Sequence, residues 1–135
     1  MEPRILALGN FVLQIILFGV LIYSGYIAGF KRELGRHCTV MRVAVPLLII
    51  SAVVVMLPSM LGYSGDGVTL TWFIAEMYIH HTLGLAVIGL WVFANLAQTG
   101  RIRLQSRLLP HMRAAAIIWV ITFIMGVHIY LVIWV

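Results

Sequence analysis

The sequence predicts an all-α integral membrane protein, folded as an antiparallel bundle of four transmembrane helices. Of its 135 residues, 63% are hydrophobic and only 10% are charged, whereas soluble domains carry about 25% charged residues. Four apolar runs each exceed the roughly 20 residues that a helix needs to cross a bilayer. The connections between them are short, so successive helices should pack as antiparallel neighbours. We expect one domain over residues 1–135.

The four apolar runs predict helices over about 5–30, 39–61, 69–97 and 110–135. None of the runs alternates polar and apolar residues, as the strands of a membrane β-barrel do. Pro110 suits the start of the last helix, because the N–H that proline lacks has no helical partner there. The second connection holds three glycines and Asp66, a composition typical of an exposed turn.

Basic residues predict the orientation of the bundle. They flank the first connection (Lys31, Arg32, Arg36 and Arg42) and the third (Arg101, Arg103, Arg107 and Arg113), and the second connection has none. The positive-inside rule then places connections one and three in the cytoplasm and both termini outside, in the cell's inner or plasma membrane. We therefore interpret the residues behind the net charge of +5 as ones that set the orientation and contact lipid headgroups, and we expect no nucleic-acid partner.

The third run carries ionisable residues at membrane depth, where such groups are costly and usually face a bundle interior. His80 and His81 lie about 11 residues, or ~16 Å, from its outer end, and His128 lies ~10 Å from the outer end of the fourth run. These histidines therefore share one leaflet on adjacent antiparallel helices. Two imidazoles on opposite sides of one iron are the axial ligands of a haem, so we expect haem b at this level.

One stripe of the third helix favours His80 over His81. Glu76, His80 and Gly84 recur at helical spacing, and this polar stripe should face the bundle. Gly84 would let a flat macrocycle approach the backbone. His81 lies about 100° round the helix and stays a candidate. On the first helix, Asn10 and Gln14 could orient an imidazole through a hydrogen bond or contact a quinone head.

Two other interpretations of this cluster stay open. Glu76, His80 and His128 together offer a carboxylate and two imidazoles, a donor set that suits copper, zinc or iron without a porphyrin. Alternatively, an intramembrane histidine can serve packing alone, because a hydrogen bond between helices contributes roughly 0.6 kcal/mol on average.

His37 and His111 form a second pair, one at the start of each helix that follows a basic connection. They could ligate a second haem or a metal at the cytoplasmic interface. Histidines at such an interface are also commonly solvated or paired with lipid phosphate. Both interpretations stay open for this pair.

Three local features resemble the DUF420 family of small four-helix membrane proteins, whose bacterial members are linked to cytochrome oxidase assembly. They are KRELGRHCTVM at 31–41, HHTLGLA at 80–86, and the basic connection before His111. The resemblance implies that His37, His80 or His81, and His111 match the family's histidines. The second helix lacks the histidine that the family often carries near its outer end. The plan is also similar to b-type membrane cytochromes such as the cytochrome b561 class.

The sequence thus favours a b-type cytochrome-like protein that transfers electrons and has no substrate turnover of its own. The alternatives are an accessory factor that brings haem or copper to a respiratory oxidase, and a structural subunit of a membrane complex. Expected partners are the lipid bilayer, a quinone or a respiratory-chain complex. We expect an oligomer or a subunit of a larger complex.

Overall fold

The computed structural model describes residues 3–58, 61, 71–101 and 108–135. Its elements are α1 (Pro3–Gly29), α2 (Leu34–Ser51), the π-helix η1 (Ala52–Met56), α4 (Thr71–Gln98) and α5 (Leu109–Trp134). All regular structure in these residues is helical, which confirms the predicted all-α class. The second helix begins at Leu34, five residues before the expected start at 39. The expected start of the third helix at 69 lies outside the described residues.

In the described part of the chain, four helices are long and apolar enough to cross a membrane: Arg4–Gly29, Leu34–Met56, Thr71–Gln98 and Leu109–Trp134. Many of their large apolar side chains point outward, among them Leu85, Val43 and Ile124, which are 69%, 62% and 61% exposed. Soluble monomers rarely expose large continuous apolar surfaces. The outer surface of the bundle therefore has the character of one that contacts acyl chains.

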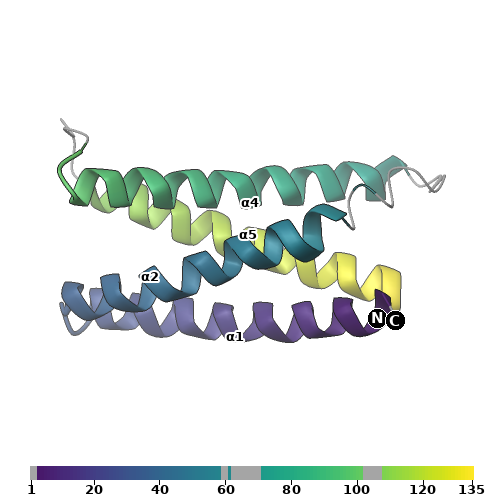
Figure 1. Ribbon diagram of the computed structural model, residues 1–135, viewed down its shortest axis with the longest axis horizontal. Helices are drawn as coiled ribbons and strands as arrows, with labels where there is room; N and C mark the ends of the chain where they lie inside the picture. The colour runs from purple at the N-terminus through teal and green to yellow at the C-terminus, as the bar shows by residue number, and fades with distance from the viewer. Residues whose placement is uncertain (1–2, 59–60, 62–70, 102–107) are drawn as a thin grey trace.

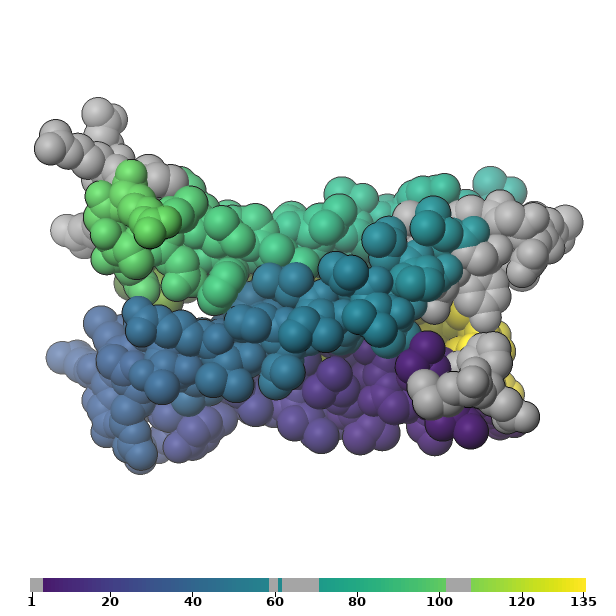
Figure 2. Space-filling view, viewed as in Figure 1, coloured from purple at the N-terminus to yellow at the C-terminus, as the bar shows by residue number. Residues whose placement is uncertain are grey.

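The helices run antiparallel, and α2 and α5 cross the pair α1 and α4 on opposite faces (Figure 1). Both chain termini lie at one end of the bundle, which we call the terminal end. In the space-filling view, α2 and η1 cover the face between α1 and α4 obliquely (Figure 2). All four helices therefore contribute walls to the space at the bundle centre.

The middle of the bundle is closed by packed apolar side chains. Its buried residues come from every helix: Leu17, Leu21, Ala44, Val45, Leu48, Val87 and Trp119. Phe18 of α1 also stacks on Phe123 of α5, with ring centroids 4.1 Å apart. Between helices surrounded by lipid, such contacts stabilise through van der Waals packing, since lipid is as apolar as the core. This layer separates the two ends of the bundle.

The second helix widens into the π-helix Ala52–Met56 directly after Ser51. The sequence pattern predicted an ordinary helix up to 61, so this change of geometry is a correction. Three consecutive valines lie in the widened turn, and β-branched side chains crowd the helix backbone. Single π turns inside α-helices are frequent at functional sites.

The end of α4 is fixed by Gly100, whose φ of +72° is a left-handed conformation. Its N–H donates to the carbonyl oxygen of Ala97 at 3.2 Å, and the N–H of Arg101 donates to that of Leu96 at 3.0 Å. This pair of bonds is a Schellman motif, for which glycine is the favoured residue. The basic third connection follows from that point.

Candidate functional site

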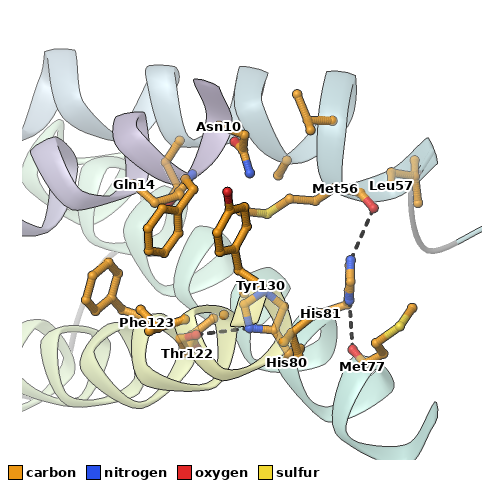
Figure 3. Close-up of a pocket in the computed structure, with 18 of the residues that line it drawn as sticks. Asn10, Gln14, Met56, Leu57, Met77, His80, His81, Thr122, Phe123 and Tyr130 are labelled. Atoms are coloured by element: carbon orange, nitrogen blue, oxygen red, sulfur yellow. Dashed lines mark hydrogen bonds between the residues drawn. The ribbon is translucent and has the colours of Figure 1, made fainter. Parts of the chain in front are cut away.

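A cavity of about 290 Å³ lies between all four helices, on the terminal-end side of the core (Figure 3). We call it the four-helix cavity. Its polar lining residues are Asn10, Gln14, His80, His81, Thr122 and Tyr130, and most of its other lining residues are apolar, including Phe11, Met56, Met77, Val87, Trp119 and Phe123. A concave, mostly apolar space with a few fixed polar groups is the usual form of a small-molecule site.

His80 is buried in the wall of this cavity, with 7% of its surface exposed. Its Nδ1 lies 3.0 Å from the backbone carbonyl oxygen of Thr122 on α5. A carbonyl only accepts hydrogen bonds, so in the neutral ring the proton sits on Nδ1 and donates to it. The other nitrogen, Nε2, then carries a lone pair. Among the described residues no hydrogen-bond donor reaches that lone pair.

His81 lines the same cavity but is held differently. Its Nδ1 lies 2.7 Å from the carbonyl oxygen of Met77, one turn back on α4. Its Nε2 lies 3.3 Å from the carbonyl oxygen of Met56, the last residue of the π-helix. Each ring nitrogen therefore faces a backbone acceptor, and the ring connects α4 to the end of η1. Figure 3 shows His80 and His81 on one side of the cavity.

The opposite wall carries a chain of three polar side chains from α1 and α2. The Gln14 amide donates to the hydroxyl of Ser51 at 2.8 Å, and that hydroxyl donates to the amide oxygen of Asn10. Ser51 is 4% exposed, and its one hydroxyl serves both amides. The NH₂ group of Asn10 and the carbonyl oxygen of Gln14 are not used in this chain, so they can serve a ligand.

Tyr130 adds a hydroxyl to this wall from α5. Its ring stacks on Phe11 of α1, with centroids 4.2 Å apart and an interplanar angle of 5°. The stacking fixes the direction of the ring, and Figure 3 shows its hydroxyl on the same side as the Asn10 amide. Asn10 and Tyr130 thus present two hydrogen-bonding groups to the cavity.

Glu76 and His128 form an ion-pair contact that is separate from the cavity lining. The Nδ1 of His128 lies 2.7 Å from a carboxylate oxygen of Glu76, and the side chains are 53% and 16% exposed, respectively. The His128 ring also lies against Trp72, with centroids 6.3 Å apart. The structure therefore places the two predicted axial histidines against different partners, His80 against Thr122 and His128 against Glu76.

The glycine in closest contact with a histidine is Gly126. A methyl group on Gly126 would lie 3.0 Å from Cε1 of His80. At Gly84 it would meet only the methyl group of Thr122, at 3.9 Å, which is ordinary contact. Gly84 and Gly126 both line the cavity. The imidazole thus occupies the space that an α5 side chain would otherwise fill.

The second histidine pair lies at the other end of the bundle. The Nδ1 of His37 is 2.7 Å from the hydroxyl oxygen and 3.1 Å from the carbonyl oxygen of Ser24, a fully buried residue of α1. His111 packs on Phe93, with centroids 5.3 Å apart. Its Nδ1 is buried and has no hydrogen-bond partner in the described part of the chain. No hydrogen bond or ring contact joins His37 to His111 within those residues, so their shared site stays a prediction.

Ser51 and Tyr130 were not predicted as site residues. The sequence does single out Ser51, because it is the one polar residue in the apolar run from Val43 to Leu57. A lone polar residue inside a span usually faces the bundle interior. Tyr130 has no such signal, since tyrosine near a helix end also suits the membrane interface.

Within the described residues, no group of three or more His, Cys, Asp or Glu side chains is arranged to hold a metal ion. The predicted set of Glu76, His80 and His128 accordingly stays a prediction. Comparison with known proteins gives no match either: no family model, curated protein or solved structure matches the chain, so the resemblance to the DUF420 family also stays a prediction.

Proposed function

We propose that this chain is an integral membrane redox protein that holds a planar cofactor in the four-helix cavity and transfers electrons at the membrane. One observation carries the proposal. His80 is buried in the cavity wall with its Nδ1–H tied to the Thr122 carbonyl. That bond fixes the proton on Nδ1, so Nε2 keeps a lone pair that can bind a metal ion. Backbone carbonyl oxygens fix the tautomer of metal-bound histidines in the same way.

Haem b is the proposed cofactor, and His80 suits it as one axial ligand. The iron would supply one-electron chemistry, while the chain binds, orients and shields it. His81 is the weaker candidate, because both of its nitrogens already face carbonyl oxygens. Gly84 and Gly126 both line the cavity, and the lack of a side chain at Gly126 leaves room for the His80 ring. The apolar walls would exclude water, which is one means by which proteins set a haem potential.

The second axial ligand is where the arrangement is least suited to haem. His128 is paired with Glu76 through Nδ1, which leaves the lone pair of its Nε2, but the residue is not part of the cavity lining, so its ring would have to move to reach an iron at His80. The cavity volume of about 290 Å³ is also at the lower limit for drug-sized ligands. Four pyrrole rings would require the helices to separate. Bis-histidine ligation therefore implies a rearrangement on binding.

The absorption spectrum of the purified protein tests this proposal. We expect a Soret band that shifts on dithionite reduction, its loss in His80→Ala and in His128→Ala, and its retention in the matched variant His81→Ala. Equal haem content in His80→Ala and wild type would remove His80 from the site. A colourless protein with stoichiometric copper would support the accessory-factor alternative instead. A colourless, metal-free protein would support a structural subunit.

The proposed orientation places the two basic connections in the cytoplasm and both termini outside. Cys38 is the single cysteine of the chain, so a Cys38→Ser background allows one reporter thiol at a time. A cysteine at Arg32 should resist a membrane-impermeant maleimide in intact cells and react in inverted vesicles. A cysteine at Val135, which is exposed at the C-terminus, should show the opposite pattern. Labelling of Arg32→Cys in intact cells would reverse the proposed orientation.

A further inference from the structure

The four-helix cavity, as it stands, matches a smaller ligand than a macrocycle. Its volume of about 290 Å³ is enough for one substituted six-membered ring with a short apolar extension. The polar groups are not scattered. One hydrogen-bond acceptor lies on the α4 wall, and a group of donors lies on the wall formed by α1 and by Tyr130 of α5 (Figure 3).

The acceptor on the α4 wall is Nε2 of His80. Because Nδ1 donates to the Thr122 carbonyl, Nε2 can accept a proton from a ligand but cannot donate one. A ligand with an O–H at this point gains a hydrogen bond. A ligand with a carbonyl oxygen there places two lone pairs against each other.

The donors on the opposite wall are the NH₂ group of Asn10 and the hydroxyl of Tyr130. Ser51 donates to the Asn10 amide oxygen, which leaves the NH₂ group as the part of Asn10 free to serve a ligand. Tyr130 is held in place by its stacking on Phe11. A ligand oxygen that reaches this wall can therefore accept from either group.

The cavity also extends to the apolar outer surface of the bundle. Three of its lining residues, Val53, Leu57 and Leu85, are 58%, 45% and 69% exposed. They come from η1, the residue after it, and α4. A ring that occupies the cavity could leave an apolar tail along these side chains, in the position of the acyl chains of surrounding lipid.

We infer that the four-helix cavity binds the head of a lipid-soluble para-quinol, with one O–H donating to Nε2 of His80 and the opposite oxygen accepting from Asn10 or Tyr130. A ring with oxygens at both ends, one of them carrying a proton toward His80, satisfies both walls at once. The apolar tail of such a molecule suits the exposed side chains at the opening. The inference goes beyond the proposed function, because it assigns a different class of ligand to the same cavity and the same histidine.

The test is titration of the full-length protein in lipid nanodiscs with decylubiquinol and, separately, with decylubiquinone. Binding is followed by quenching of tryptophan fluorescence, since Trp119 and Trp134 both line the cavity. The quinone has no O–H for His80, so it loses one hydrogen bond. We expect its Kd to exceed that of the quinol by about 3- to 10-fold.

Two variants and one control locate the binding site. In His80→Leu the preference for quinol over quinone should disappear. Tyr130→Phe keeps the stacked ring and removes only the hydroxyl, so both forms should bind about 2- to 10-fold more weakly with their ratio unchanged. The control is Tyr78→Phe, an exposed tyrosine of α4 outside the cavity, which should bind like wild type. Thermal unfolding shows whether each variant is folded. If His80→Leu is unfolded, the binding measured for Tyr130→Phe decides the test.

The outcomes separate this inference from the proposed function. Equal binding of quinol and quinone, or binding that neither cavity variant changes, overturns the quinol site. If haem co-purifies in a His80-dependent manner and the quinol does not bind, the inference fails and the proposed function stands. If neither haem nor quinol binds the wild-type protein, both fail.

Discussion

Gly126 offers the sharpest test of how His80 is held. A methyl group there would lie 3.0 Å from Cε1 and 3.7 Å from both ring nitrogens of His80, so in Gly126→Ala the ring must shift by a few tenths of an ångström. The ring cannot shift freely, because its Nδ1 is bonded to the Thr122 carbonyl at 3.0 Å. The matched variant is Gly84→Ala, whose methyl group would make only an ordinary contact at 3.9 Å.

The comparison of these two variants isolates the contact. Both glycines lie well inside a helix, so the gain of up to about 1 kcal/mol from alanine's helix propensity applies to both and cancels in the difference. What is left is the overpacking at His80, for which cores show about 1–3 kcal/mol. We expect Gly126→Ala to be less stable than Gly84→Ala by at least about 1 kcal/mol, the value of the hydrogen bond that the ring must weaken.

The assay is equilibrium unfolding of both variants in detergent micelles, followed by tryptophan fluorescence, with His80→Ala as the shared background control. In that background the imidazole is absent, so the two glycine substitutions should have equal effects. Equal free energies of unfolding of Gly126→Ala and Gly84→Ala in the wild-type background would refute the placement of His80 against α5.

Three further predictions concern the other polar contacts. Ser51→Ala leaves both α1 amides without their shared partner and should lower the free energy of unfolding by about 1–3 kcal/mol. The measurement is equilibrium unfolding, with Thr82→Ala, a change at an exposed residue, as the control. An effect no larger than that of the control would contradict the hydrogen bonds from Gln14 to Ser51 and from Ser51 to Asn10. Ser24→Ala should cost less, about 0.5–1.5 kcal/mol, because His37 keeps the carbonyl of residue 24; a larger loss would show that the hydroxyl is its main partner. A double-mutant cycle of Glu76→Gln and His128→Ala should give a coupling of about 0.6 kcal/mol, the average for hydrogen bonds between membrane helices; a coupling of zero would contradict the contact between Nδ1 of His128 and Glu76.

The lengths and class of the helices could be predicted because they follow from hydropathy alone. A bilayer requires long apolar runs and internal backbone hydrogen bonding, and the sequence shows four such runs. The start of α2 was less accessible. Arg36 and His37 lie inside α2, where low hydropathy concealed a helical turn.

The rotation of α5 against α4 could not be predicted. A helix that is apolar on all sides has no stripe to show which face it turns inward, and α5 is of this kind. Spacing along one helix correctly relates Glu76 to His80, but it says nothing about which α5 residue lies opposite. The structure sets Gly126 against His80 and His128 against Glu76, two residues apart on α5. Only the packing between helices decides that pairing.

The π-helix was equally hidden, and it matters for the site. A π turn adds residues to one turn of a helix and shifts every later side chain around the axis. In η1 this shift follows Ser51 directly and ends at Met56, whose carbonyl oxygen faces His81. A pattern that assumes 3.6 residues per turn therefore assigns the wrong face to residues after 51, including those that line the cavity opening.

The haem and quinol proposals both use the lone pair on Nε2 of His80. An iron atom and an O–H proton are both electron-poor, so either can occupy the same position in front of this nitrogen. The two ligands differ in the group that they need on the side of the cavity opposite His80. Haem with two axial imidazoles needs a second lone pair on the far side of the iron, and His128, whose Nδ1 pairs with Glu76, is not part of the cavity lining. A quinol needs a donor there, and Asn10 and Tyr130 are already in the lining. Because the quinol requires no change in the packing of α5, it is the ligand for which the observed arrangement is preorganised.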